Sequence, residues 1–294
     1  MKRIAVIVIG SNSTRMLAAD ACDQLSNEIR ARVETRLFLG MSEDCVLSRD
    51  AIDYTVQSVC MLKQKAEDSG AELIGIYATS ASRDAKNSAD LRSAIKNATN
   101  HDLQIISGEE EAAYSFFGAA GADFCGVIDI GGGSTEVVLG HGMQIHAAQS
   151  LQLGASRLFK TQPINSLEDI EKALVIAREA VSKLPVEILS HPETERFYLI
   201  GGTGTSCARV ARYIPEGCFL TREMIANMLR TVAETPREDR VRIPGFPPAR
   251  IDILPAGMVI LLAILDALRI KKAFVTERVN ADGLLRAYVH KKFA

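Results

Sequence analysis

The chain has 294 residues, of which 47% are hydrophobic, and a formal net charge of -2 at pH 7. This length and composition allow two well-packed domains of ordinary size. The near-neutral charge argues against a general nucleic-acid-binding surface, because such surfaces need clustered Lys and Arg. The longest apolar run, at 253–265, contains Pro and Gly and falls short of the ~20 residues that a membrane span requires.

The six cysteines are scattered along the chain, without a C-x-x-C pair or a nearby His at zinc spacing. We therefore expect reduced thiols, most of them buried, which are typical of a reducing compartment. The apolar run behind the basic start, at 4–9, is too short for a signal peptide. These features together predict a cytoplasmic protein.

Two segments resemble each other: IAVIVIGSNST at 4–14 and VIDIGGGST at 127–135. In each, a β-branched run stops at Gly, small hydroxyl residues follow, and a second apolar run begins, which predicts a strand, a tight turn and a strand. Gly and Ser or Thr at such a turn leave backbone N–H groups uncovered and add hydroxyl donors. Each turn is therefore a candidate phosphate-binding loop.

The remaining elements of the first half follow from apolar periodicity and turn residues. In chain order we expect a third strand at 29–39, a helix at 48–69, a strand at 73–79, a helix at 88–98, a strand at 103–106 and a helix from 107. Ser107, followed at the third position by Glu110, is a capping-box signature at the start of that last helix.

The second half repeats this plan, which predicts that one α/β unit is duplicated. After its hairpin we expect a strand at 147–153, a helix at 166–184, a strand at 196–200 ending in a Gly-Gly-Thr-Gly turn, a helix at 221–235, a proline-rich loop at 243–248, an apolar helix through 267, a strand at 273–276 and a terminal helix. The fold class is α/β, with two mixed five-stranded sheets around a central cleft. The expected domains are 1–122 and 123–294, and the last helix, about 281–294, is a candidate to pack on the first domain.

Several strings, in order, resemble one family. They are GSNS at 10–13, ATSA followed by RDAKN within 78–87, ISGEEEA at 106–112, IDIGGGSTE at 128–136 and PAG at 255–257. From 4 to about 285 the chain resembles the exopolyphosphatase / guanosine pentaphosphate phosphohydrolase (Ppx/GppA) family in its short two-domain form. This family lies in the superfamily of actin, the heat-shock chaperone ATPases and the sugar kinases.

The resemblance implies two ribonuclease H-like, actin-like ATPase domains. It also implies hydrolysis of terminal phosphoanhydride bonds in inorganic polyphosphate, in pppGpp or in both, with Mg²⁺ as the cofactor. The expected partners are accordingly polyphosphate or a guanosine polyphosphate, with no nucleic-acid polymer and no membrane. A homodimer is left open.

Three carboxylates are candidates for the chemistry. Glu111 matches the family's catalytic glutamate and is expected to orient the attacking water, although a first-turn carboxylate can also serve the helix dipole alone. Asp129 ends a buried strand, where an ionised carboxylate is costly unless something binds it, so we expect Mg²⁺ there, with a turn hydrogen bond as the alternative. In family members Glu136 points toward the site as a second catalytic residue, with an exposed strand position as the alternative.

The candidate phosphate ligands come from three glycine-rich turns and two arginines. The set is Gly10, Ser11, Asn12, Ser13, Arg15, Arg83, Gly131, Gly132, Gly133, Ser134, Gly202, Thr203 and Gly204. Repetition of the glycine turn after three strands favours phosphate binding over a simple turn role. For the two arginines a surface salt bridge is the alternative.

The chain departs from the family at two positions. The first family motif has Asp two residues before its glycine, where this chain has Val8, which cannot bind a cation or its waters. The usual Gly-Leu-Arg-Glu-Gly near the C-terminus is here Val-Asn-Ala-Asp-Gly, so Ala281 takes the arginine position. Two hypotheses follow: a phosphoanhydride hydrolase with altered or reduced activity, and a polyphosphate or guanosine-polyphosphate sensor without turnover. A sugar-type kinase is disfavoured, because no phosphoryl acceptor is evident.

Overall fold

The computed structural model describes residues 2–21, 25–190 and 196–293. The chain divides into two compact units, Met1–Gly118 with Asn280–Ala294 and Ala119–Val279. The C-terminal residues therefore group with the first unit. Each unit is an α/β structure on a mixed sheet, so the expected fold class is confirmed.

The first unit is built on a five-stranded sheet in the order β3-β2-β1-β4-β5. Its strands are β1 (Lys2–Ile9), β2 (Thr14–Ala21), β3 (Leu25–Val33), β4 (Glu72–Ala78) and β5 (Leu103–Ile105). β2 pairs antiparallel with β1 on one side and with β3 on the other, and β4 and β5 continue the sheet parallel to β1. The hairpin predicted around the first glycine turn is confirmed.

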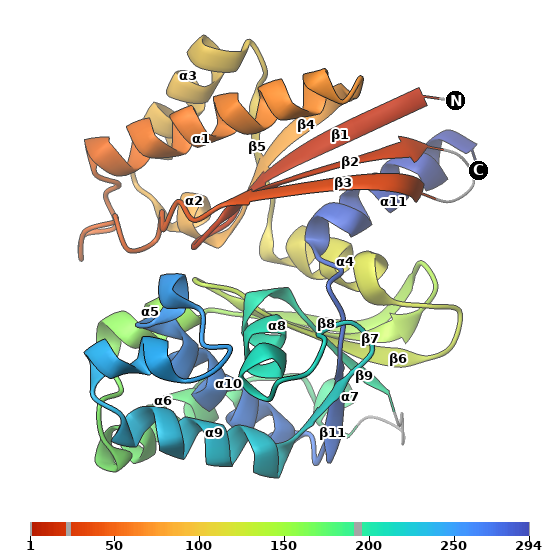
Figure 1. Ribbon diagram of the computed structural model, residues 1–294. Coiled ribbons are helices and arrows are strands. Elements are labelled where there is room, and N and C mark those ends of the chain that lie inside the picture. Colours follow the sequence, from red (N-terminus) through yellow and green to blue (C-terminus); the bar gives the residue numbers. More distant parts are fainter. Residues whose placement is uncertain (1, 22–24, 191–195, 294) are drawn as a thin grey trace. The chain divides into compact units, whose positions relative to one another are not determined.

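Helices cover both faces of this sheet (Figure 1). They are α1 (Arg49–Asp68), α2 (Ser80–Asp84), α3 (Ser88–Thr99), α4 (Gly108–Ala119) and α11 (Asn280–Phe293). Alternation along β1 explains the double cover, because successive side chains point to opposite faces. Ala5, Ile7 and Ile9 join the core beneath α1 and α3. Val6 and Val8 are buried on the other face, and α11 packs against β1 and β2.

The third strand ends earlier than the sequence pattern predicted. The expectation was a strand over 29–39, whereas β3 stops at Val33. Arg36 has a φ of 48°, a left-handed conformation that interrupts an extended strand. The backbone N–H groups of Arg36 and Phe38 instead donate to the carbonyls of Asn12 and Ser11, at 2.8 and 2.9 Å. These hydrogen bonds to the first turn therefore end the strand, although the apolar periodicity of the sequence continues.

The second unit has a six-stranded sheet in the order β10-β11-β9-β6-β7-β8. Its strands are β6 (Cys125–Ile130), β7 (Thr135–His141), β8 (Gln144–Leu151), β9 (Phe197–Ile200), β10 (Phe219–Thr221) and β11 (Lys272–Val275). The additional strand is β10, which pairs with the edge of β11 over three residues. Such a short strand carries too little periodicity to be recognised from sequence.

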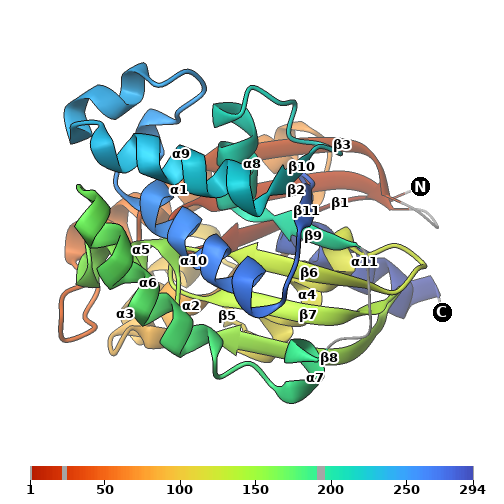
Figure 2. The ribbon, with the colours of Figure 1, turned by 90° about the horizontal axis from the view of Figure 1, so that it is seen from below.

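The helices of the second unit include one that is apolar throughout. The set is α5 (Ala155–Thr161), α6 (Leu167–Val181), α7 (Val186–Leu189), α8 (Gly201–Val210), α9 (Arg222–Glu234) and α10 (Ile253–Ala267), with 3₁₀ turns at Arg237–Arg242 and Pro248–Arg250. In Figure 2, α10 lies over the sheet with α6 and α9 on its two sides. This enclosure explains why α10 is buried from Ile253 to Leu265. In the part of the chain that the structure describes, no helix is long and apolar enough to cross a membrane.

The described cysteines, Cys45, Cys60, Cys125, Cys207 and Cys218, are free, as expected, and Cys22 lies outside the described residues. Of these five, only Cys125 and Cys207 are buried, so the expectation that most of the thiols are buried is wrong for the described residues. Burial raises the pKa of the Cys207 thiol to about 12, so this thiol stays protonated at physiological pH.

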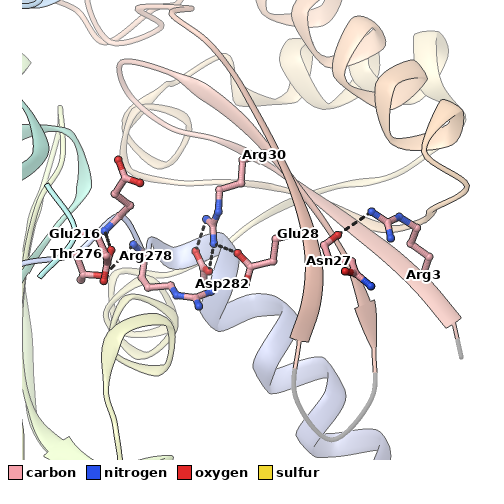
Figure 3. Close-up of polar contacts among 9 residues, drawn as sticks. Arg3, Asn27, Glu28, Arg30, Glu216, Thr276, Arg278 and Asp282 are labelled. Carbon is pink, nitrogen blue, oxygen red and sulfur yellow. Dashed lines mark hydrogen bonds and ion pairs between the residues drawn. The ribbon is translucent and has the colours of Figure 1, made fainter. Parts of the chain in front are cut away.

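An ion pair attaches α11 to the first sheet (Figure 3). Asp282 is fully buried and accepts two hydrogen bonds from the guanidinium of Arg30, at 2.9 and 2.5 Å. Arg30 also pairs with Glu28. Burial lowers the pKa of Arg30, but the hydrogen bonds with the two carboxylates outweigh it and raise the pKa overall, so Arg30 stays charged.

The same helix packs closely on α4. A Cβ placed on Gly283 would lie 1.8 Å from the carbonyl oxygen of Tyr114, so only glycine fits there. Three residues further on, Arg286 donates to the carbonyl of Phe117 at 2.9 Å. Since α4 carries Glu111, α11 takes part in positioning that residue.

We expect Asp282→Asn to destabilise the protein by about 1–3 kcal/mol, because the half-buried Arg30 loses its buried counter-charge. The measurement is urea unfolding followed by circular dichroism. Glu28→Gln is the control, since its exposed ion pair with Arg30 is worth about 0–1 kcal/mol. Equal losses in the two variants would contradict an anchoring role for Asp282.

Candidate functional site

The two glycine turns have the same backbone geometry. Gly10 donates its N–H to the carbonyl of Ser13, and Gly131 donates to Ser134, both at 3.0 Å. A Cβ placed on either glycine would approach the same carbonyl, at 2.9 and 3.1 Å. The two hairpins are thus one local structure used twice, as the sequence similarity predicted.

In the second turn, three successive carbonyls are held by one segment of chain. The carbonyls of Gly131 and Gly132 accept hydrogen bonds at 2.8–3.0 Å from backbone N–H groups of the first turn of α5. The carbonyl of Gly133 accepts from Arg157 Nε at 2.7 Å. In a trans peptide the C=O and the following N–H point in opposite directions. The N–H groups of residues 132–134 are therefore directed away from α5, which is the arrangement of an anion-binding nest.

The first turn follows the same rule. Its carbonyls at Ser11 and Asn12 are the acceptors for Phe38 and Arg36 described above. The N–H groups of Asn12 and Ser13 accordingly point away from that segment. Both turns thus present consecutive N–H groups on the side opposite to the segment that holds them.

The side chains of the first turn connect it to α2. Ser11 Oγ accepts from the backbone N–H of Ala81 at 3.2 Å, and Ser13 Oγ accepts from Arg15 Nε at 3.2 Å. Asn12 donates through Nδ2 to Glu34 at 2.5 Å. The structure thereby brings the predicted residues 11–13 and 15 together with the segment that carries Arg83.

Arg83 and Glu111 form a buried ion pair. Arg83 Nη1 donates to Glu111 Oε2 at 2.7 Å and to the carbonyl of Ile106 at 2.9 Å. The two side chains are 16% and 8% exposed, so Arg83 does form a salt bridge, the alternative considered for it, but in a largely buried place and not on the surface. The neighbouring Glu110 is exposed and exchanges hydrogen bonds with Ser107, at 2.8 and 3.1 Å, so the predicted capping box is confirmed.

Asp129 and Glu136 lie side by side on β6 and β7. They are paired in register, so their side chains share one face of the sheet. Asp129 is 9% and Glu136 1% exposed, so the exposed position considered for Glu136 is wrong. Ser150 Oγ donates to Glu136 Oε1 at 2.8 Å.

This pair suits a hard divalent cation. Among the residues that the structure describes, no group of three or more His, Cys, Asp and Glu could hold a metal ion. Mg²⁺ needs only one or two carboxylates, because waters and substrate oxygens complete its coordination. Two adjacent buried carboxylates repel each other, and a cation between them removes that repulsion.

The third glycine segment is a helix rather than the expected turn. Gly201 starts α8 directly after β9, with a φ of 79° that favours glycine. Its neighbours need glycine for close packing, since a Cβ on Gly202 would lie 1.8 Å from Arg250 Nη2 and one on Gly204 2.6 Å from Leu199. Asp129 Oδ1 would lie 2.7 Å from a Cβ on Gly201, so this carboxylate sits beside the positive end of α8.

Thr203 lies in the same first turn of α8. It donates to the carbonyl of Ile130 at 3.4 Å. A Cβ on Gly257 would lie 2.7 Å from Thr203 Oγ1, which gives the PAG string a packing role.

The two departures from the family motifs are both buried, since Val8 is 3% and Ala281 1% exposed.

Sequence reasoning missed four residues around the turns. Arg250 is 6% exposed, and its guanidinium covers Gly202. Gly154 allows α5 to approach the second turn, since a Cβ there would lie 2.4 Å from the carbonyl oxygen of Gly132. Arg157 and Glu34 bind the second and first turns. Only Gly154, a glycine next to a predicted strand end, carried a local signal.

A model of the Ppx/GppA phosphatase family matches residues 20–292. The chain belongs to this family. The match includes Glu111, Asp129 and the second glycine turn, whereas the first turn precedes it. Membership in the Ppx/GppA phosphatase family supports a phosphoanhydride hydrolase.

Two solved Aquifex aeolicus Ppx/GppA structures and that of an exopolyphosphatase are similar over nearly their whole length. The crystal structure of the Aquifex aeolicus family member has 26% identity and a TM-score of 0.81, covering 100% of this chain and 99% of that one. A second structure, of the Aquifex aeolicus PPX-GPPA enzyme, has 27% identity and a TM-score of 0.80, covering 97% and 99%. An exopolyphosphatase from Cytophaga hutchinsonii, at 20% identity, has a TM-score of 0.88, covers 99% and 98%, and shows the fold alone.

We expect a double-mutant cycle on Arg83→Gln and Glu111→Gln to give a coupling energy of about 1–3 kcal/mol in urea unfolding, because each single change removes the oppositely charged partner from a largely buried contact. The control is Lys63→Gln with Glu67→Gln, an ion pair on α1 with side chains 23% and 44% exposed. Its expected coupling is below about 0.5 kcal/mol. A coupling near zero at Arg83 and Glu111 would show that the pair is not formed in solution.

Proposed function

We propose that this protein removes the terminal phosphate from inorganic polyphosphate, from pppGpp or from both, by Mg²⁺-assisted attack of water. The observation that carries the proposal is the orientation of the two glycine turns. Consecutive N–H groups at 12–13 and 132–134 offer fixed donors to phosphate oxygens, because the carbonyls before them are held on the other side. A phosphate chain supplies several such oxygens at once.

In this proposal Glu111 orients the attacking water. Its carboxylate is buried and held by Arg83, so it has few rotamers to lose when substrate binds. The water oxygen forms the new bond to the terminal phosphorus, and the bridging P–O bond breaks. The water proton passes to Glu111 or to phosphate oxygens, and the shortened chain leaves with the bridging oxygen.

Asp129 and Glu136 are the residues proposed to hold Mg²⁺. When bound, the ion neutralises charge on the phosphate oxygens during transfer. The positive end of α8 and the N–H groups of the second turn would bind the same anionic groups. Arg15 and the buried Arg250 are proposed to add fixed positive charge in their respective units. The free thiols support a reducing compartment such as the cytoplasm for this activity.

The test measures phosphate release from polyphosphate and from pppGpp with Mg²⁺. We expect Glu111→Gln to lower kcat by about 10²–10⁴-fold, as for loss of a group that handles the attacking water. Glu110→Gln is the matched control, because it removes the same charge from the adjacent residue, whose contacts are those of a cap. EDTA should stop the reaction, and added Mg²⁺ should restore it.

Equal activity in the two Gln variants would contradict the role of Glu111. Tight binding of either substrate without phosphate release by the unaltered protein would instead favour the sensor hypothesis. The buried Val8, in place of a family carboxylate, is the observation behind that alternative.

A further inference from the structure

Two histidine side chains meet at the end of the β7–β8 hairpin. His141 is the last residue of β7, and His146 lies near the start of β8. The Nδ1 atom of His141 and the Nε2 atom of His146 are 3.2 Å apart. β8 is the edge strand of the second sheet, beside β7 (Figure 2). His141 is half-buried and His146 is exposed, so solvent reaches the pair.

A β-bulge determines where His146 lies in the hairpin. Gly140 pairs with Ile145 and Leu139 pairs with Ala147, so His146 is an extra residue that the pairing register skips. A bulge re-aims the side chain of its extra residue and increases the local twist, and bulges are over-represented beside functional sites. The placement of the His146 ring beside His141 is therefore a property of this bulge and not of regular pairing.

Neighbouring contacts restrict the two rings. Phe124 packs edge-on against His146, with ring centroids 5.3 Å apart and ring planes at 76°. The turn between the histidines begins at Gly142, whose φ of 55° suits a two-residue hairpin turn. The N–H of Gly142 donates to the carbonyl of Gly121 at 2.7 Å, which ties the hairpin to the segment before β6. The imidazoles are thus held close together before a ligand binds, which lowers the entropic cost of binding.

The separation of the two ring nitrogens is close to that of two ligands of one metal ion. Zn–N bonds of about 2.0–2.1 Å at a tetrahedral angle put the two nitrogens about 3.3–3.4 Å apart. Without an ion, one imidazole donates a hydrogen bond and the other accepts it. For both nitrogens to bind an ion, the proton of the donating nitrogen moves to the other nitrogen of its own ring. Both rings stay neutral, and their heavy atoms need to move little.

The donor atoms determine the class of ion. Imidazole nitrogen suits Zn²⁺, Ni²⁺ and Cu²⁺, whereas Mg²⁺ and Ca²⁺ prefer oxygen ligands. Zn²⁺ takes four ligands, so waters would fill the positions that the two imidazoles leave open. The pair therefore differs in chemistry from Asp129 and Glu136. Five residues of β7 separate His141 from Glu136, which is roughly 17 Å at about 3.4 Å per residue, so one ion cannot occupy both places.

We propose that His141 and His146 form a site for a borderline divalent transition-metal ion such as Zn²⁺, which connects β7 to β8 when it is bound. This inference goes beyond the proposed function and does not depend on it.

The experiment titrates untagged protein with Zn²⁺ by calorimetry in the presence of excess Mg²⁺, which competes for sites made of oxygen ligands. His141→Gln and His146→Gln should each weaken Zn²⁺ binding by at least about 10-fold, because loss of a group behind a metal ligand already costs about 10–100-fold. His101→Gln is the matched control: it removes an imidazole from the segment before β5 in the first unit and should leave the affinity unchanged.

Cu²⁺ then serves as a spectroscopic probe, because it binds such nitrogen ligands more tightly than Zn²⁺ does. Electron paramagnetic resonance should show coupling to two imidazole nitrogens in the unaltered protein and to one or none in the His141→Gln and His146→Gln variants. Thermal unfolding in EDTA shows whether each variant is folded. Added Zn²⁺ should raise the unfolding temperature of the unaltered protein and of His101→Gln, and not that of the other two variants.

Unchanged Zn²⁺ affinity in His141→Gln or in His146→Gln would overturn the inference. The absence of Zn²⁺ binding in excess Mg²⁺, or a Cu²⁺ spectrum with a single imidazole in the unaltered protein, would overturn it as well. None of these measurements uses phosphate release. A protein that binds Zn²⁺ through both histidines and releases no phosphate supports the inference and contradicts the proposed function alone.

Discussion

The hydrogen bonds that hold the carbonyls of the two glycine turns are the constraint on which the candidate site depends. A peptide plane with its C=O fixed has its N–H fixed as well, in the opposite direction. The first turn of α5 and Arg157 fix the second turn, and the backbone at 36–38 fixes the first. The shared direction of these N–H donors therefore results from packing behind the turn. Gly154 is required for the same reason, because any side chain there would separate α5 from the turn.

The duplicated backbone carries side chains with different tasks. The second unit gathers two buried carboxylates in one row, which is favourable only with a cation or another positive group nearby. The first unit has an aliphatic residue and two arginines in the equivalent row, and one of its buried acids, Glu111, is paired with Arg83. The duplication thus preserves the backbone geometry of the turns, while charge differs between the halves.

Much of the fold could be predicted from local patterns in the sequence. The two hairpins, the long helices and the capping box at Ser107 rest on contacts within a few residues, where periodicity and capping rules apply. These local rules failed where contacts with residues far away in the sequence determine the structure. The strand ending at Val33 is cut short by hydrogen bonds to the first turn, and Gly202 after β9 is required by a contact with Arg250 rather than by a turn. Neither partner is visible in the local sequence.

The placement of Glu111 shows how such distant contacts combine. The capping box fixes the start of α4, and Arg83 fixes the carboxylate. Gly283 and Arg286 of α11 hold the later turns of α4. A carboxylate that orients water gains most when its position is set before substrate arrives, because the entropy of ordering it is then lost on folding. Residues from three separate parts of the chain meet this requirement, so the C-terminal helix contributes to the site without supplying a reactive group.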